Sequence, residues 1–258
     1  MAELPTLHYI EYHLTEHCNF DCTGCGHFSP FAAEGFADPI AFEHDIAKLA
    51  QLFSNIRKIC LLGGEPLLHP EPEAFIRIAR RHFPATDLRI VTNGILLKKI
   101  GDSFWDACRE ARVSLDISLY PPLRKSHEAF DGLCAAHGVN CVVRPVDEFL
   151  VGINARGDSN PEEAMKYCRS HFYCPFLQDS RLHVCAMPAM VHYYNNHFDR
   201  KISDDAGIDI FADGITGEKI IAMLEKPVAT CSFCSCKYKP VKWRHARAEN
   251  HVTGDYEV

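Results

Sequence analysis

Cys18-Asn19-Phe20-Asp21-Cys22-Thr23-Gly24-Cys25 is the stretch around which the chain is organised. It follows an alternating segment, residues 9–15, that predicts a first strand. Three thiolates spaced C-x3-C-x2-C on one short loop can converge on one face of an iron-sulfur cluster and leave its fourth iron without a protein ligand. Such an open iron can bind a small molecule, whereas a fully ligated cluster only passes electrons. A structural zinc loop is the alternative interpretation of the same cysteines.

A second motif, Gly63-Gly64-Glu65-Pro66, follows directly after the apolar run 59–62. Two glycines allow the backbone to come close to a ligand, and a carboxylate complements a cation. The two motifs, in this order and each at a predicted strand end, resemble those of the radical S-adenosylmethionine (radical SAM) enzymes. The resemblance covers roughly the first 150 residues.

The resemblance implies a cofactor set and a chemistry. A [4Fe-4S] cluster is expected on Cys18, Cys22 and Cys25, with S-adenosyl-L-methionine on its open iron. One electron, from a donor such as flavodoxin or ferredoxin, would cleave that cofactor to methionine and a 5′-deoxyadenosyl radical, which abstracts hydrogen from a substrate. The family usually has an aromatic residue just before the third cysteine, where this chain has Gly24, so we expect Phe28 or His27 to pack on the adenine. The expected cofactor-binding residues are Gly63, Gly64, Glu65, Pro66, Asn93, Ser118 and Phe28.

Composition excludes several classes of protein. The chain has 258 residues, of which 47% are hydrophobic and 24% charged, as in an ordinary soluble globule. A net charge of −7 argues against a nucleic-acid partner. The sequence shows no export signal and no apolar run of membrane-spanning length, so we expect a cytoplasmic protein without a membrane partner. Thirteen cysteines, an odd number, favour metal ligation over a disulfide framework.

Strand and helix patterns alternate through the first half of the chain. Further strands are predicted over 56–62, 88–92, 113–120 and 141–146, and helices at Pro39, at Pro72 and over 105–110 and 128–137. Repeated strand-helix units predict a parallel sheet with ligands at the carboxyl ends of its strands. The predicted fold class is therefore α/β. By the family resemblance, residues 1–155 should form a partial (β/α)6 TIM-like barrel with its sixth strand at 149–153.

Three polar residues on the strands are candidates for catalysis. Glu11 and His13 alternate with apolar residues, so they should point into the barrel, as should Arg144. Glu11 and His13 can act as bases or form a buried polar pair that satisfies itself, and Arg144 is better suited to orientation or anion stabilisation.

A cysteine-rich α+β region is expected after the turn-rich stretch 154–161. We place it at 156–240 and read 241–258 as a C-terminal tail, with the basic stretch 237–247 solvated. A hairpin turning at Asp179-Ser180, a helix over 218–225 and a C-x2-C pair resemble the twitch domain, the shortened relative of the SPASM domain. That resemblance implies a second [4Fe-4S] cluster on Cys174, Cys185, Cys231 and Cys234. Cys168 can replace Cys174, Cys236 can replace Cys234, and zinc is the competing metal.

The second cluster bears on the reaction class. An auxiliary cluster can accept the electron that a substrate radical loses on oxidation, which favours dehydrogenation of a small sugar-like or polyol-like molecule. The alternatives are a maturase that modifies a peptide or protein side chain, a redox-neutral isomerase, and a protein that binds metal without catalysis.

Overall fold

The computed structural model describes residues 3–258, and the internal contacts of the chain divide it into two units. The first unit comprises Met1–Asn19 and Glu34–Asp147, and the second comprises Phe20–Ala33 and Glu148–Val258. The chain therefore passes from one unit to the other at Asp147, before the boundary expected at 155. The segment 20–33, which carries two of the three clustered cysteines, belongs with the C-terminal part of the chain.

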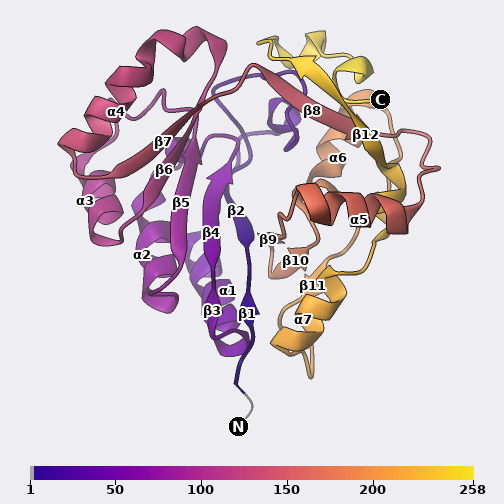
Figure 1. Cartoon of the computed structure of the whole chain (residues 1–258), viewed down its shortest axis with the longest axis horizontal. Helices are drawn as coiled ribbons and strands as arrows, with labels where there is room; N and C mark the ends of the chain where they lie inside the picture. Colours follow the sequence, from indigo (N-terminus) through magenta and orange to yellow (C-terminus); the bar gives the residue numbers. More distant parts are fainter. Residues whose placement is uncertain (1–2) are drawn as a thin grey trace. The chain divides into compact units, whose positions relative to one another are not determined.

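A parallel sheet of strands β2, β4, β5, β6 and β7, neighbours in that order, forms the centre of the first unit (Figure 1). Helices α1 to α4 connect consecutive strands, as the sequence predicted. The bounds are β2 (Ile10–Thr15), α1 (Pro39–Leu52), β4 (Lys58–Gly63), α2 (Pro72–His82), β5 (Asp87–Thr92), α3 (Asp102–Glu110), β6 (Ser114–Leu119), α4 (His127–Ala136) and β7 (Asn140–Pro145). Strands β1 (Thr6–Leu7) and β3 (Asn55–Ile56) form a separate parallel pair.

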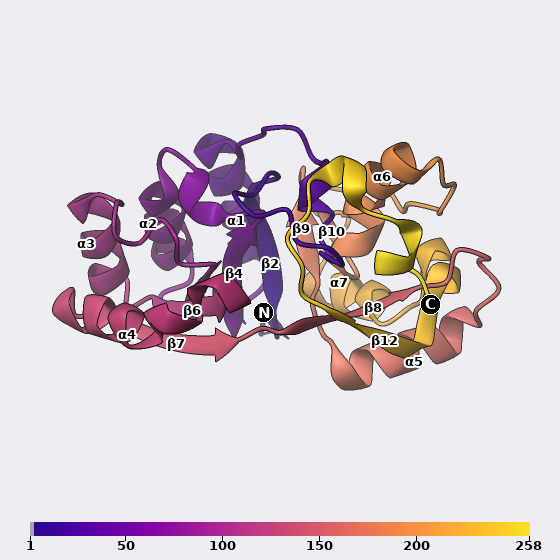
Figure 2. The same ribbon diagram turned by 90° about the horizontal axis from the view of Figure 1, so that it is seen from above.

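The two faces of this sheet differ in character, as period-two alternation requires. Apolar side chains of the strands are fully buried on one face, among them Ile10, Leu14, Ile59, Leu61, Leu88, Ile90, Leu115 and Ile117. Figures 1 and 2 show α1, α2 and α3 on one side of the sheet, where Phe42, Ile46 and Leu49 of α1 are also buried. The polar residues of the strands lie on the opposite face, which positions them for chemistry.

The strand that we expected to be the sixth of the barrel pairs elsewhere. Strand β8 (Glu148–Ile153) is antiparallel to β12 (Cys234–Lys242) in a two-stranded sheet. Only Val146 and Asp147 separate β7 from β8, whereas a parallel neighbour needs a crossover of a dozen residues or more. The structure therefore has a mixed α/β fold in which the parallel run contains five strands.

The second unit contains the predicted hairpin. Strands β9 (Phe176–Gln178) and β10 (Arg181–His183) are antiparallel and turn at Asp179-Ser180, and β11 (Ile208–Asp209) pairs with β10. Helix α7 (Gly217–Leu224) matches the predicted helix, but α5 (Pro161–His171) and α6 (Ala186–Phe198) were not predicted. The core of this unit contains Phe28, Ile153, Phe176, Met190, Val191, Tyr194, Ile202 and Tyr256.

The stretch 237–247 is not the solvated tail that the sequence suggested. Its first part lies in β12, and its last part pairs with the cysteine loop through an antiparallel bridge between Cys22 and His245. Within residues 3–258, no helix is both long and apolar enough to cross a bilayer.

Candidate active site

The glycine motif is fixed against the end of β2. The backbone N–H of Gly64 donates to the Thr15 carbonyl at 2.9 Å, and that of Glu65 donates to the His17 carbonyl at 3.1 Å. A Cβ added to Gly64 would lie 1.9 Å from the His17 oxygen, and one added to Gly63, whose φ is +141°, would lie 2.2 Å from the Thr15 oxygen. Both glycines are therefore required by close approach to the protein's own backbone, immediately before Cys18.

Glu65 is buried where the ends of β4 and β5 meet. One carboxylate oxygen accepts from the Leu67 N–H at 3.1 Å and the Thr92 hydroxyl at 2.5 Å, and the other accepts from the Asn93 N–H at 2.8 Å. Burial raises the pKa of Glu65 to about 7, although these hydrogen bonds to its oxygens oppose the shift. Glu65 also begins the short 3-10 turn Pro66–Leu68, in which Pro66 is buried. This carboxylate thus supports the fold whatever else it binds.

Asn93 connects the glycine motif to the first cysteine. Its side-chain nitrogen donates to the Asn19 side-chain oxygen at 2.7 Å and lies 3.9 Å from the Cys18 sulfur, while its own side-chain oxygen accepts from the Ile95 N–H at 3.0 Å. The carboxyl ends of β2, β4 and β5 are thereby joined around Cys18. Parallel strands bring their ends to one edge, which is why residues distant in the sequence meet there.

In the second unit, Cys22 and Cys25 lie on a loop held by the C-terminal segment. The Trp243 indole N–H donates to the Cys22 sulfur at 3.1 Å, and Thr23 N–H donates to the Arg244 carbonyl at 3.0 Å. Burial raises the pKa of Cys22 to about 12, and the indole hydrogen bond opposes that rise. Burial also raises the pKa of Cys25, and backbone donors from residues 27–29 lower it. These donors suit sulfur ligands that carry negative charge when metal binds.

Phe28 belongs to the core of the second unit. Its ring is 3% exposed and lies 5.4 Å from that of Tyr194 and 6.0 Å from that of Tyr256, measured between centroids. It also borders a cavity of about 140 Å³ that is lined by Gly24, Val151 and Met187 among others. Its expected contact with adenine stays a prediction.

The catalytic candidates lie on the polar face of the parallel sheet. Glu11 accepts from the Tyr9 hydroxyl at 2.8 Å, and burial raises the pKa of this carboxyl. His13 is buried beside Glu16, with 3.3 Å between ring nitrogen and carboxylate oxygen. Arg144 is exposed and lies 3.6 Å from Asp116, so it is some distance along the sheet from Glu11. Ser118, in register with Arg144, lies on the same face.

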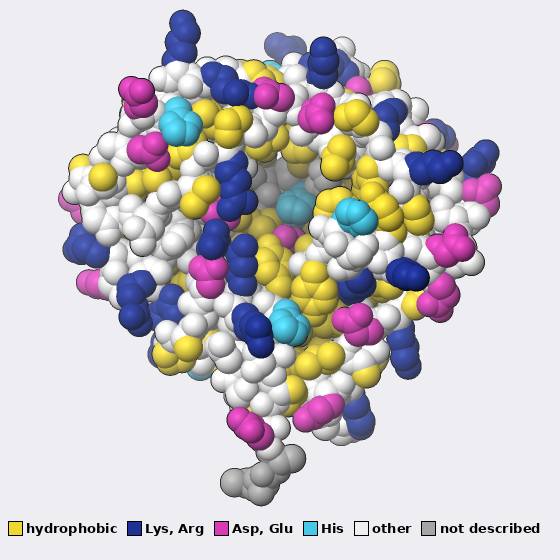
Figure 3. Space-filling view, viewed as in Figure 1, with side chains coloured by type: hydrophobic (Ala, Val, Ile, Leu, Met, Phe, Trp, Pro, Cys, Tyr) yellow, Lys and Arg dark blue, Asp and Glu magenta, His cyan; other side chains and the backbone are white. Residues whose placement is uncertain are grey.

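This face carries a network that the sequence analysis missed. Arg89 donates to Asp116 at 3.0 Å and 3.2 Å and also pairs with Asp87 at 3.0 Å. The Lys58 ammonium lies over the Tyr9 ring, 5.5 Å from its centroid. Figure 3 shows Lys and Arg side chains with Asp and Glu side chains among them over the strands of the first unit. The sequence signal for this network was the alternation within β4 and β5, since Lys58 and Arg89 interrupt strands that are otherwise largely apolar.

The late cysteines gather in one region of the second unit. Burial raises the pKa of Cys185 well above its ordinary value, and the neighbouring Cys174, Cys234 and Cys168 raise it further. The pKa of Cys234 rises to about 12 through burial and through Cys231, Cys168 and Cys236. The four assigned ligands thus have sulfur neighbours of the right type, and Cys168 and Cys236 stay open as alternatives.

These thiols are the candidate metal ligands of the chain. Across residues 3–258, no three His, Cys, Asp or Glu side chains converge closely enough to hold one metal ion. A tetrahedral zinc site needs sulfur atoms about 4 Å apart, whereas an iron-sulfur cluster lies between more widely spaced thiolates. Thiolate donors suit both an iron-sulfur cluster and zinc, so the metal at each group of cysteines stays a prediction.

The family comparison agrees with this geometry. Residues 12–128 match the family model described as Radical SAM superfamily. This part of the chain is a radical SAM domain. It contains Cys18, Cys22 and Cys25, the glycine motif and Asn93, but not the late cysteines.

Several relatives match over this domain. The chain is 33% identical over 152 residues to the GTP 3′,8-cyclase of Nautilia profundicola, covering 57% of this chain and 45% of that one. It is also 33% identical over 111 residues to the GTP 3′,8-cyclase of Aliarcobacter butzleri, covering 42% of this chain and 34% of the other. The chain thus spans less than half the length of these curated relatives.

Solved structures with a similar arrangement include BtrN in complex with AdoMet and 2-DOIA. This likeness has a TM-score of 0.49 at 16% identity and covers 90% of this chain and 87% of BtrN. Native anSMEcpe with bound AdoMet has a TM-score of 0.44 at 16% identity, covering 67% and 52% of the two chains.

Proposed function

We propose that this protein is a radical SAM enzyme that oxidises a small, hydroxyl-rich molecule. A [4Fe-4S] cluster on Cys18, Cys22 and Cys25 with bound S-adenosyl-L-methionine would supply a 5′-deoxyadenosyl radical for hydrogen abstraction. The observation that carries the proposal is the junction of three strand ends at Cys18. There Gly63 to Glu65 bond to residues 15–17, and Asn93 joins Glu65 to the cysteine loop.

Glu65 and Asn93 have the roles of cofactor ligands in this proposal. A carboxylate has about four lone-pair sites, and the protein uses three of those on Glu65, so one is left for the methionyl ammonium. Gly63, Gly64 and Pro66 shape the same strand end, while Asn93, Ser118 and Phe28 are assigned to the rest of the cofactor.

Charge balance on the polar sheet face supports an uncharged substrate. Its cations are Lys58, Arg89 and Arg144, and its carboxylates are Glu11, Asp87 and Asp116. The two arginines are paired with carboxylates, which does not favour a triphosphate, because triphosphate sites need an excess of positive charge. This argues against the nucleotide cyclisation that the relatives' names suggest and in favour of a polyol that hydrogen-bonds to Glu11, Ser118 and the Asp116 pair.

Oxidation of an alcohol carbon removes a hydrogen atom, a proton and an electron. Glu11 is the assigned base, because its raised pKa brings it nearer to neutral pH, and His13 is the second candidate. The electron would go to a second cluster on Cys174, Cys185, Cys231 and Cys234. A peptide-modifying maturase remains the alternative reaction class.

Two measurements test the proposal. Protein purified without oxygen should hold about eight irons, and the triple alanine variant of Cys18, Cys22 and Cys25 about four, as two four-iron clusters require. Cys22→Ser should lose iron and 5′-deoxyadenosine production together. Normal cofactor cleavage in Cys22→Ser would refute the first site, and zinc in place of the second four irons would remove the electron acceptor.

A further inference from the structure

Arg169 is a charged side chain on helix α5 that the proposed chemistry leaves without a role. Its guanidinium donates from Nη1 to the Val184 carbonyl at 3.5 Å and from Nη2 to the Leu224 carbonyl. The central carbon of the guanidinium lies over the Tyr173 ring, 4.8 Å from the ring centroid. One side chain therefore connects α5 to the segments at Tyr173, Val184 and Leu224.

Two of these contacts lie next to the late cysteines. Tyr173 directly precedes Cys174, and Val184 directly precedes Cys185. Because the guanidinium binds a ring and a carbonyl on these two segments, it fixes the backbone that carries two of the assigned ligands.

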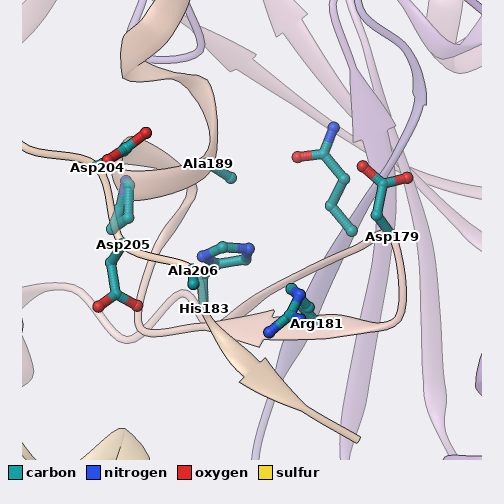
Figure 4. Close-up of a pocket in the computed structure, with 9 residues that line it drawn as sticks. Asp179, Arg181, His183, Ala189, Asp204, Asp205 and Ala206 are labelled. Atoms are coloured by element: carbon teal, nitrogen blue, oxygen red, sulfur yellow. The ribbon is translucent and has the colours of Figure 1, made fainter. Parts of the chain in front are cut away.

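No carboxylate balances the charge of Arg169 in the part of the chain that the structure describes. The side chain is half-buried, it forms no ion pair with residues 3–258, and its solvent-inaccessible Nε has no hydrogen-bond partner among them. By contrast, Arg181, which lines a pocket of about 290 Å³ (Figure 4), lies 3.9 Å from a carboxylate oxygen, and Arg200 lies 2.9 Å from one. A cation that is partly removed from water is stabilised by a counter-charge, so Arg169 is suited to an anionic group nearby.

The thiols of Cys168 and Cys231 are groups on which this charge acts. Cys231 is an assigned ligand of the second cluster, and Cys168 is the alternative to Cys174. Burial raises the pKa of both thiols, and the Arg169 guanidinium opposes the rise at each. Asp205, which lines the pocket in Figure 4, acts in the opposite direction on the pKa of Cys231. A thiol must lose its proton to bind metal, so Arg169 favours the state in which these sulfurs are ligands.

The same charge bears on electron transfer. A four-iron cluster on four thiolates carries a net negative charge, which increases by one when an electron is added. A cation beside it stabilises the reduced state more than the oxidised state and therefore raises the reduction potential. A raised potential suits an electron acceptor, because the electron that a substrate radical loses on oxidation must be held.

We propose that Arg169 is a positioning residue of the second cysteine group, and that its charge favours the reduced state of the cluster bound there. This inference rests on the proposed function, because it needs iron and sulfur at these cysteines. Arg169 takes no part in bond formation. It holds the ligand segments and supplies the counter-charge for the single electron that the substrate radical gives up.

An anaerobic redox titration of the full-length protein, followed by electron paramagnetic resonance, tests this role. The background is the triple alanine variant of Cys18, Cys22 and Cys25, so that only the second cluster gives a signal. Arg169→Gln removes the charge and keeps a donor for a carbonyl. A unit charge about 10 Å from the added electron, at an effective dielectric constant of about 20, changes the ratio of reduced to oxidised cluster by on the order of tenfold. We therefore expect this ratio to fall about tenfold at a fixed potential, which corresponds to about 59 mV for one electron.

Two further variants separate charge from structure. Arg169→Lys keeps the charge and should keep the potential of the background protein. Arg247→Gln removes an exposed arginine of the same unit that forms no ion pair with residues 3–258, and it should leave the potential unchanged. Iron loss in Arg169→Gln that Arg169→Lys restores would support the counter-charge role.

Three results would overturn the inference. The first is an unchanged potential in Arg169→Gln at full iron content, and the second is an equal shift in Arg247→Gln, which would be an effect of net charge. The third is iron loss in both Arg169 variants, which would assign the side chain to folding. Zinc in the background protein, with Arg169 intact, would refute the proposed electron acceptor and this inference with it, whereas the first two results leave the iron and the acceptor in place.

Discussion

The hydrogen bond from Trp243 to Cys22 should set the reduction potential of the proposed catalytic cluster. Trp243→Phe removes the indole N–H, which lies 3.1 Å from the sulfur, and keeps an aromatic ring opposite Phe20, whose centroid is 5.8 Å away. The loop keeps its other restraints, because Thr23 and Ala246 still form backbone bonds across it and Arg244 still pairs with Asp255 at 2.9 Å. The substitution therefore removes mainly one donor.

The magnitude follows from the charge on the sulfur. A hydrogen bond to a charged group contributes about 1.5–3 kcal/mol, and it is stronger on the reduced cluster, which carries one more negative charge. If about 1 kcal/mol of it depends on that electron, the potential falls by about 40 mV, since about 1.4 kcal/mol corresponds to 59 mV for one electron. At a fixed donor potential the ratio of reduced to oxidised cluster then falls about fivefold.

An anaerobic redox titration followed by electron paramagnetic resonance measures this shift. A Cys231→Ala background removes the signal of the second cluster, and Trp105→Phe, at the other tryptophan of the chain, is the control. A potential unchanged within about 10 mV at full iron content would refute the reasoning, because a donor to an iron-bound sulfur must favour the reduced state. Loss of iron in Trp243→Phe would show that the indole holds the loop rather than tunes the cluster.

Four further substitutions test the geometry of the fold and the site. Gly64→Ala should destabilise the protein by about 1–3 kcal/mol in urea unfolding, because its Cβ would lie 1.9 Å from the His17 oxygen. Gly132→Ala, in α4 with nothing within 4 Å, should stabilise the protein by about 1 kcal/mol. Ser180→Gly should stabilise the hairpin by about 1 kcal/mol, since Ser180 has a φ of +61°. Glu65 has a folded pKa of about 7, above its ordinary 4.5. Its contribution to the free energy of unfolding is therefore complete below pH 4.5, and about 3 kcal/mol of it is lost as pH rises through 7. Glu65→Gln should flatten this dependence of stability on pH, and an unchanged dependence would assign it to another group.

The repeating half of the fold was predictable because its signals are local. Alternation within β2 and β6 and prolines at the starts of α1 and α2 are read from a few neighbouring residues. Helix α5 had such a signal too, since Asn160 caps it and Pro161 occupies its first turn, but the same residues also read as a turn-rich boundary. Helix α6 had weaker signals, because Cys185 makes no side-chain cap and Pro188 lies within the first turn.

The contacts that complete the site were not predictable, because they join segments far apart in the sequence. Trp243 meets Cys22 across more than two hundred positions, and β8 found its partner in β12 rather than in the parallel sheet. The basic residues of 237–247 suggested solvation, yet they alternate with Tyr238, Val241 and Trp243, which can pack. That alternation was the available signal for a strand in this segment.

Glu65 shows why a motif does not separate binding from folding. The sequence predicted a carboxylate placed for a cation, and the structure adds three donors from Leu67, Thr92 and Asn93. The same donors that hold the side chain orient its remaining lone pair, so the site is preorganised and a ligand need not order it. Burial raises the pKa of Glu65 to about 7 without a cation, and an ammonium beside it would lower that pKa, because an opposite charge favours the ionised form. In the proposed complex, cofactor binding and ionisation of Glu65 would therefore be coupled, and each should strengthen the other.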